Sequence, residues 1–215
     1  GGGKPGDKPF TMEKGVWCGI YPVTQAEWQA VMGTNSSRPR THPTHPVDDV
    51  SWNIVQEFLE NTNSQKSGGS YLYRLPTEEE WEYICRGGPI SQSNSAFDFT
   101  FATSKTNLTP VRSNDLSSHQ ANFDGDYPAG IAKEGPYLRR TSPVGSYLPN
   151  PLGIYDMHGN VLEWTSTSEG SCRMSRGGSW SSYGECCSAA SRYRISRAAR
   201  YYYLGFRLLA VPIEE

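Results

Sequence analysis

The sequence predicts an α+β fold in a single domain, with few helices, short strands and much irregular structure. Three segments in the first ninety residues carry helix-start signals followed by apolar residues at helical spacing. Short apolar or alternating runs of strand length occur in the last third of the chain. Gly and Pro together make up about a sixth of the 215 residues, which predicts abundant turns and loops.

The composition is that of a folded chain. Hydrophobic residues make up 36%, including six Trp and thirteen Tyr, which argues against disorder. A net charge of −2 gives no electrostatic footprint for nucleic acid or for an acidic membrane surface. Because no run of eighteen apolar residues occurs, we expect no membrane-spanning segment.

The chain is divided into a linker over residues 1–9 and one domain over residues 10–215. The first eight residues are rich in Gly and Lys and contain no apolar stretch, so they are interpreted as a flexible linker and not as a signal peptide. The five cysteines are odd in number and irregularly spaced, so no disulfide framework can be assigned. We expect most of them to be buried as small apolar side chains.

The first predicted helix begins at Thr24. Thr24 and Glu27 form a capping box, in which each side chain can cap the backbone N–H of the other residue. Trp28 and Val31 follow at helical spacing, and Gly33 can end the helix in the left-handed conformation.

Two more helices are predicted before residue 90. Ser51 opens the second, whose apolar stripe consists of Trp52, Val55, Phe58 and Leu59. Thr77 and Glu80 form another capping box at the start of the third helix, and Gly87 ends it.

The second half of the chain is predicted to contain irregular structure and then strands. Residues 89–150 show no long periodic stretch and only short candidate strands, so we expect side chains, waters or an ion to anchor this region. Apolar or alternating runs at Gly153–Met157, Val161–Trp164 and Leu204–Val211 predict strands separated by turns.

Five blocks of sequence, in order, resemble the formylglycine-generating-enzyme-like (sulfatase-modifying-factor) family. The blocks are His45–Trp52, Tyr73–Tyr83, Gly153–Trp164, Arg176–Trp180 and Leu204–Arg207. The resemblance implies a divergent C-type-lectin-like fold with much irregular structure. Since this family contains both enzymes and binding proteins, the fold alone does not choose a function.

The resemblance to the enzymes fails at one position. In the enzymes, two cysteines bind copper and activate oxygen; aligned without gaps, the second falls on Cys187 and the first on Ser182. A single thiolate beside a hydroxyl does not make a two-sulfur Cu(I) site. The adjacent Cys186 is not a simple replacement, because neighbouring side chains in an extended segment point to opposite faces. We therefore expect no catalysis, with a copper-dependent oxidase or related thiol oxidoreductase that uses Cys187 as the alternative.

The segment from about 177 to 207 instead resembles the variable region of diversity-generating-retroelement proteins of the Treponema type, in which fixed framework residues alternate with diversified ones. The implied framework is Gly177, Gly178, Ser179, Trp180, Cys187, Ala190, Arg192, Arg200, Leu204, Gly205, Phe206 and Arg207. The implied ligand-binding positions are Ser181, Ser182, Tyr183, Cys186, Ser191, Tyr193, Arg194, Ile195, Tyr201, Tyr202 and Tyr203. These eleven are called the variable positions below.

The variable positions have the composition of a binding surface. Three consecutive tyrosines, Tyr201–Tyr203, cannot all face the protein core if they lie in a strand, because successive side chains point to opposite faces. Tyrosine offers a large contact area at low entropic cost, with serine as an adaptable neighbour. The competing interpretation is a tyrosine-rich edge strand. We expect Trp180 and Phe206 to pack in the core. The sequence departs from the family at Leu162, where Trp is usual, and at Arg197, where related variable regions often carry Pro.

No cofactor is expected to be required for binding, but the resemblance also implies a possible calcium site. Some family members bind calcium through residues that match Asp156, Gly159, Val161 and Glu163 here, with carbonyls of the backbone contributing ligands. The competing interpretation is that these groups only hydrogen-bond a turn.

The functional hypothesis is a non-catalytic receptor that displays a diversified binding surface on a lectin-like scaffold. Its expected ligand is a protein or exposed polymer of another cell. The resemblance also implies a place at the cell surface or outside the cell, with a lipid anchor as the possible attachment. The remaining alternative is an inert fold with no partner.

Overall fold

The computed structural model describes residues 10, 12, 15–38, 42–65, 69–89 and 96–213. The predicted linker at residues 1–9 lies outside them. The helices are α1 (Gln25–Met32), α2 (Trp52–Gln65), α3 (Glu78–Cys85) and the short 3₁₀ helix η1 (Gly184–Cys187). The strands are β1 (Trp17–Cys18), β2 (Tyr71–Arg74), β3 (Phe99–Ala102), β4 (Pro110–Ser113), β5 (Leu162–Glu169), β6 (Cys172–Arg176), β7 (Arg192–Ser196), β8 (Leu204–Gly205) and β9 (Leu209–Pro212).

All three predicted helices are present, with the predicted caps. Thr24 and Thr77 each accept a hydrogen bond from the backbone N–H three residues on, and Glu27 and Glu80 reach back to the cap residues. Gly33 ends α1 in the left-handed conformation at φ 70°. These ends are local in sequence, and a capping box satisfies backbone donors without help from the rest of the fold.

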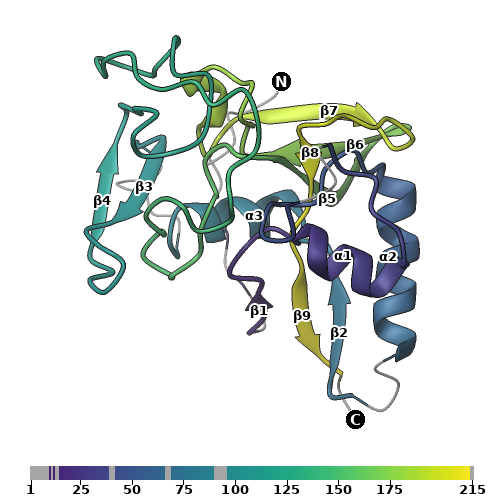
Figure 1. Cartoon of the computed structure of the whole chain (residues 1–215). Coiled ribbons are helices and arrows are strands. Elements are labelled where there is room, and N and C mark those ends of the chain that lie inside the picture. Colours follow the sequence, from purple (N-terminus) through teal and green to yellow (C-terminus); the bar gives the residue numbers. More distant parts are fainter. Residues whose placement is uncertain are drawn as a thin grey trace.

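The strands form three sheets. The largest has the order β7-β6-β5-β8, in which β8 runs parallel to β5 and the other pairs are antiparallel. A second sheet has the order β1-β9-β2, and β3 and β4 form a hairpin. Figure 1 shows β7 at the upper right, α2 at the right edge of the molecule and the β3–β4 hairpin at the left.

Two of the predicted strands were wrong in detail. Gly153–Met157 is a loop, because the side chain of Asn150 accepts hydrogen bonds from the backbone N–H groups of Leu152 and Ile154. The run Leu204–Val211 is divided into β8 and β9, since the Arg207 side chain turns inward and the Phe206 carbonyl accepts from the Val23 N–H.

The main core lies between the four-stranded sheet and the helices. Trp28 stacks on Phe58 at 5.3 Å, and Phe206 meets both rings edge-on. Phe206 therefore packs in the core as predicted. Trp164 of β5 is fully buried and donates its indole N–H to the carbonyl of Val50.

Charged side chains are part of this interior. Arg207 and Glu163 are both fully buried, and the guanidinium contacts the two carboxylate oxygens at 2.7 and 2.8 Å. Arg176 of β6 pairs with Glu82 of α3 at 2.6 Å. Buried charges are tolerated when they are paired and hydrogen-bonded. The first pair joins the segment after β8 to β5, and the second joins β6 to α3.

Side chains anchor the long irregular region. Asn122 donates to the carbonyl of Arg140 and to Asn160, and Asn150 donates to the carbonyl of Ile84. This confirms that side chains hold the region.

Candidate functional site

The predicted framework is mostly buried. Eight of its twelve residues are buried, namely Gly177, Gly178, Ser179, Cys187, Leu204, Gly205, Phe206 and Arg207. Gly178 has φ 69°, and a Cβ there would lie 2.6 Å from the Cys187 sulfur. Close packing of this kind fixes the backbone from which the variable side chains project.

None of the eleven variable positions is buried. Tyr183, Arg194, Tyr201 and Tyr202 are exposed, and the other seven are half-buried. Within β7 the pattern alternates: Arg192, Arg194 and Ser196 are exposed, while Tyr193 and Ile195 pack partly against the core. Tyr193 also donates its hydroxyl to the carbonyl of Cys186. The tyrosines therefore lie at the surface, with Tyr193 and Tyr203 seated more deeply than the other three.

The variable positions surround a hollow of about 490 Å³. The residues that line it are Leu162, Ser179, Ser181, Ser182, Tyr193, Arg194, Ile195, Tyr201 and Tyr203, so seven of the nine are variable positions. They come from the turn after β6, from β7 and from the segment before β8. The fold thus gathers three separate parts of the predicted variable region around one opening.

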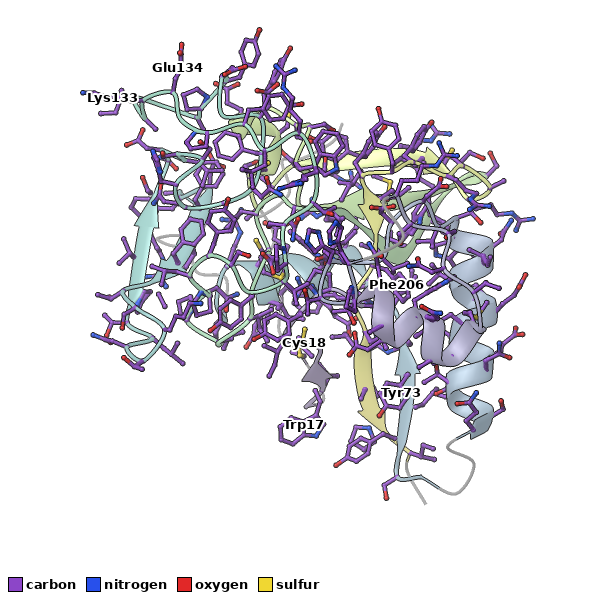
Figure 2. The ribbon with its side chains drawn as sticks, viewed as in Figure 1. Trp17, Cys18, Tyr73, Lys133, Glu134 and Phe206 are labelled. Carbon is purple, nitrogen blue, oxygen red and sulfur yellow. The ribbon has the colours of Figure 1, made fainter. Side chains whose placement is uncertain are left out.

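A second and larger hollow, of about 690 Å³, lies elsewhere. Its lining includes Trp17, Phe58, Tyr73 and Ala210, between the β1-β9-β2 sheet and helices α1 and α2, and no variable position lines it. Figure 2 shows Trp17 and Tyr73 at the end of the molecule opposite Lys133 and Glu134. This apolar hollow is therefore separate from the predicted binding surface.

The positions implied for catalysis do not form an activated thiol. The Cys187 thiol is buried, and burial raises its pKa well above the usual range of a thiol. A protonated thiol is neither a nucleophile nor a good metal ligand. Ser182 contacts Ser179, whose hydroxyl lies 3.1 Å away and whose backbone N–H donates to the Ser182 hydroxyl.

The cysteines are less buried than the sequence predicted. All five cysteines are free thiols; Cys85 and Cys187 are buried and the other three are half-buried, so the prediction that most are buried was wrong. No cluster of three or more His, Cys, Asp or Glu side chains suited to a metal ion occurs among the described residues.

The predicted calcium ligands lie near one another, but Glu163 is already engaged. Arg207 contacts both of its carboxylate oxygens, and the Trp81 indole donates to one of them at 2.7 Å. Asp156 accepts from the backbone N–H of Gly145, and burial raises the pKa of its carboxyl to about 6. The guanidinium of Arg207 thus supplies the positive charge that Glu163 would otherwise need. The calcium site stays a prediction.

One framework residue is not where the sequence predicted it. Trp180 is half-buried at the surface, where its ring lies 6.4 Å from Tyr137 and 5.7 Å from Tyr202. Its indole N–H donates to the Tyr202 carbonyl at 3.3 Å. Placing Trp180 in the core was therefore wrong.

Sequence reasoning also missed two aromatic residues beside the variable positions. The rings of Tyr127 and Tyr183 lie 4.3 Å apart, tilted by 36°, and the ring of Tyr137 lies 6.4 Å from that of Trp180. Both come from the long irregular region, where no periodicity marks a residue as facing the surface. The only signal in the sequence is that each tyrosine lies among turn-forming residues such as Gly, Asp and Pro, which favours a place at the surface.

Comparison with known proteins identifies the family and the fold. The sulfatase-modifying factor enzyme 1-like domain matches residues 7–211. The chaperone protein LppX of Paenibacillus barcinonensis is 31% identical, over 81% of this chain and 72% of that protein. The formylglycine-generating enzyme of Bos taurus is 36% identical over 67% of this chain, but the match spans only 33% of the enzyme.

The solved structure of Treponema denticola variable protein 1 superposes with a TM-score of 0.69, at 24% identity, over 92% of this chain and 84% of that one. These matches confirm the C-type-lectin-like fold predicted from five blocks of sequence. At 24% identity, the likeness to the variable protein establishes the fold and not the activity.

Proposed function

The chain belongs to the sulfatase-modifying factor enzyme 1-like family, and from that premise we propose that it is a non-catalytic binding protein. Its ligand would be bound by the variable positions around the 490 Å³ hollow, on a scaffold that stays constant. One observation carries the proposal: seven of the nine residues that line this hollow are variable positions.

The chemistry of the variable positions suits recognition of diverse ligands. Their exposed tyrosines offer rings with few rotatable bonds and one hydroxyl each, and the serines add small hydrogen-bonding groups. Arg194 is exposed and can form two parallel hydrogen bonds to a carboxylate. A protein or exposed polymer of another cell is the ligand class that this mixture favours.

The scaffold supports exchange of side chains at these positions. Since the framework is mostly buried and none of the variable positions is, replacing an exposed variable side chain such as Arg194 or Tyr202 opens no cavity in the core. The retroelement origin of this diversity is part of the proposal. A near-copy of the codons for residues 177–207, differing only at adenines and lying beside a reverse transcriptase gene, is the genomic arrangement expected.

A binding selection tests the proposal. The eleven variable codons would be randomised, the library displayed on phage, and binders selected against lysozyme, streptavidin and maltose-binding protein. We expect folded clones specific for each target, in which a central tyrosine changed to alanine weakens binding by ~2 kcal/mol or more. A matched control randomises eleven exposed positions outside residues 177–207. Equal recovery from both libraries would contradict the proposal.

The oxidase alternative has its own measurement. A buried, protonated Cys187 beside Ser182 favours neither Cu(I) binding nor oxygen activation. We expect no stoichiometric Cu(I) binding and no oxygen consumption in the presence of a cysteine-containing peptide. Stoichiometric copper with turnover would contradict the binding proposal.

The place of the protein at the cell surface is proposed on its likeness in fold to a variable protein. No helix in the described ranges is long and apolar enough to cross a membrane. A lipid anchor is the proposed attachment. Protease treatment of intact cells should remove the protein if it is displayed outside, whereas complete protection in intact cells would contradict this location.

Calcium is tested by following Trp81, whose indole N–H donates to Glu163. If calcium binds at Asp156, Gly159, Val161 and Glu163, it must rearrange that contact, so titration should change tryptophan fluorescence and raise the midpoint of thermal unfolding. The titration would be repeated on protein from which EDTA has removed any bound calcium. If neither quantity changes, calcium does not bind at this site.

A further inference from the structure

Seven aromatic rings gather at the predicted binding surface, and three of them are not variable positions. One row runs Tyr137, Trp180, Tyr202, Tyr203 and Tyr201, with consecutive ring centroids 6.4, 5.7, 5.6 and 5.1 Å apart. A separate pair joins Tyr127 and Tyr183 at 4.3 Å. In both groups a ring outside the variable positions contacts a variable one. We call Tyr127, Tyr137 and Trp180 the constant aromatic residues.

The backbone holds Tyr127 against the variable region. Its N–H donates to the carbonyl of Asp124, and its carbonyl accepts from the N–H of Gly184 at 2.8 Å. The N–H of Asp124 in turn donates to the carbonyl of Ser182 at 2.9 Å. These bonds involve backbone atoms only, so they tie the 124–127 turn to the loop that carries Tyr183 whatever side chain stands at 182 or 183.

Tyr137 is positioned by a close approach between two turns. The Gly135 N–H donates to the carbonyl of Gly125, and a Cβ at Gly125 would lie only 2.4 Å from the carbonyl oxygens of Gly135 and Pro136. Only glycine at 125 allows the backbone before Tyr137 to pack this closely. Because these contacts are already formed in the free protein, binding through Tyr137 costs little additional ordering.

The exposure of these residues fits ligand contact better than internal support. Tyr127 is 53% exposed, and Ile131 on the same loop is 90% exposed. Trp180 is anchored by a backbone bond to Asn160 but is only half-buried. Large rings held rigidly with one side open to solvent, next to a recessed surface, are typical of binding hot spots.

We propose that Tyr127, Tyr137 and Trp180 form a constant anchor that contacts folded protein ligands alongside the variable positions. The inference rests on the proposed function, and it adds to the binding surface three residues that are not among the variable positions. The constant aromatic residues would supply affinity common to all ligands, and the variable positions would supply discrimination. A protein ligand is favoured because rings, serine hydroxyls and arginines are mixed here as in protein-binding loops.

The test uses clones selected against lysozyme, streptavidin and maltose-binding protein from the library of eleven randomised positions, in which the anchor residues are unchanged. Tyr127→Ala and Tyr137→Ala would be introduced into each clone. We expect each change to raise Kd by about tenfold or more against all three targets, because a hot-spot ring is lost. Tyr71→Ala is the matched control: Tyr71 is 41% exposed and lies on β2, away from the variable positions.

A second readout separates contact from support. The photoreactive amino acid p-benzoylphenylalanine, placed at position 127 or 137, should cross-link to lysozyme in the lysozyme-specific clone, and at position 71 it should not. Tyr127→Phe, which keeps the ring, should retain most of the affinity. The inference is overturned if the alanine changes alter Kd by less than about twofold in all clones and no cross-link forms. Failure to select any clone would instead count against the proposed function itself.

Discussion

The framework, which is mostly buried, and the variable positions, none of which is buried, occupy the same thirty or so residues of sequence, yet they differ in what holds them. Framework residues are fixed by glycine-mediated close packing and by the buried Arg207–Glu163 ion pair. Variable side chains such as Tyr202, by contrast, are in contact with solvent over about half of their surface. Tolerance to substitution should therefore follow burial and charge pairing, and not position along the chain.

The largest expected loss of stability comes from Glu163→Gln, which removes the ion-pair partner of the framework residue Arg207. This change leaves the Arg207 guanidinium buried without its countercharge, so we expect a loss of about 3–5 kcal/mol in the free energy of unfolding. Urea denaturation measures it. The control is Arg200→Ala, which removes a half-exposed pair with Asp49 at 3.4 Å and should cost less than about 1 kcal/mol. Equal losses of stability from the two changes would show that burial of an ion pair does not determine its tolerance to substitution.

Acid should destabilise the framework through His158. Its Nδ1 contacts the Cys187 carbonyl at 2.8 Å and its Nε2 faces the Thr100 N–H at 3.3 Å. An N–H can only donate, so Nε2 must accept and the ring must be neutral. Burial lowers the pKa of His158 to about 4, below its value of 6.5 in an exposed chain.

As the pH falls from 6.5 towards 4, the unfolded chain takes up a proton at residue 158 that the folded chain does not. Stability should therefore decrease over this range by about 1 kcal/mol per pH unit from this group. Denaturation of wild type and His158→Gln at several pH values isolates the contribution, because His45 and Asp48, which also titrate abnormally, remain in both proteins. A parallel pH dependence in the two proteins would show that His158 does not titrate as described.

Replacing Gly178 with alanine should have an intermediate effect on stability, and Gly170 is its matched control. Gly178 and Gly170 both have positive φ, but an added Cβ would lie 2.6 Å from the Cys187 sulfur at Gly178 and 3.5 Å from the flexible Arg194 side chain at Gly170. Both changes to alanine incur backbone strain, and only Gly178→Ala adds overpacking. We expect Gly178→Ala to cost about 1–3 kcal/mol more than Gly170→Ala by thermal or urea unfolding. A smaller cost at Gly178 would mean that the core is looser than described.

The smallest expected effect is at the variable positions. Tyr202→Ser removes a ring that is 52% exposed, so stability should change by no more than about 0.5 kcal/mol, as is usual for surface substitutions. The same unfolding assay measures it. A loss above about 2 kcal/mol would place Tyr202 among the structural residues and remove the contrast.

The sequence predicted best those features that neighbouring residues determine together. Thr24 and Glu27 cap a helix through groups three residues apart, so their role can be assigned without the fold. Strand β2, by contrast, pairs with β9 from the other end of the chain, and the sequence did not predict it. Gly153–Met157 has a strand-like composition, but its N–H groups find partners outside a strand ladder: that of Ile154 donates to the Asn150 side chain and that of Tyr155 to the carbonyl of Ile20.

The same limit applies to the proposed binding surface. The sequence predicted its variable positions because the resemblance supplied fixed residues such as Gly178 and Phe206, which set the register of the whole segment. The sequence predicted Trp180 in the core, whereas its ring lies at the surface between Tyr137 and Tyr202, two residues far from it in sequence. Tyr127 could not be found, since its neighbour Tyr183 lies more than fifty residues away in sequence.

The central claim is that a rigid interior holds an exchangeable surface. Two display libraries test it most directly: one randomises the eleven variable positions, and the other randomises eleven of the framework positions. Resistance of displayed clones to protease measures the fraction that folds. We expect most clones of the first library to resist digestion and almost none of the second to do so. Similar survival in the two libraries would contradict the central claim.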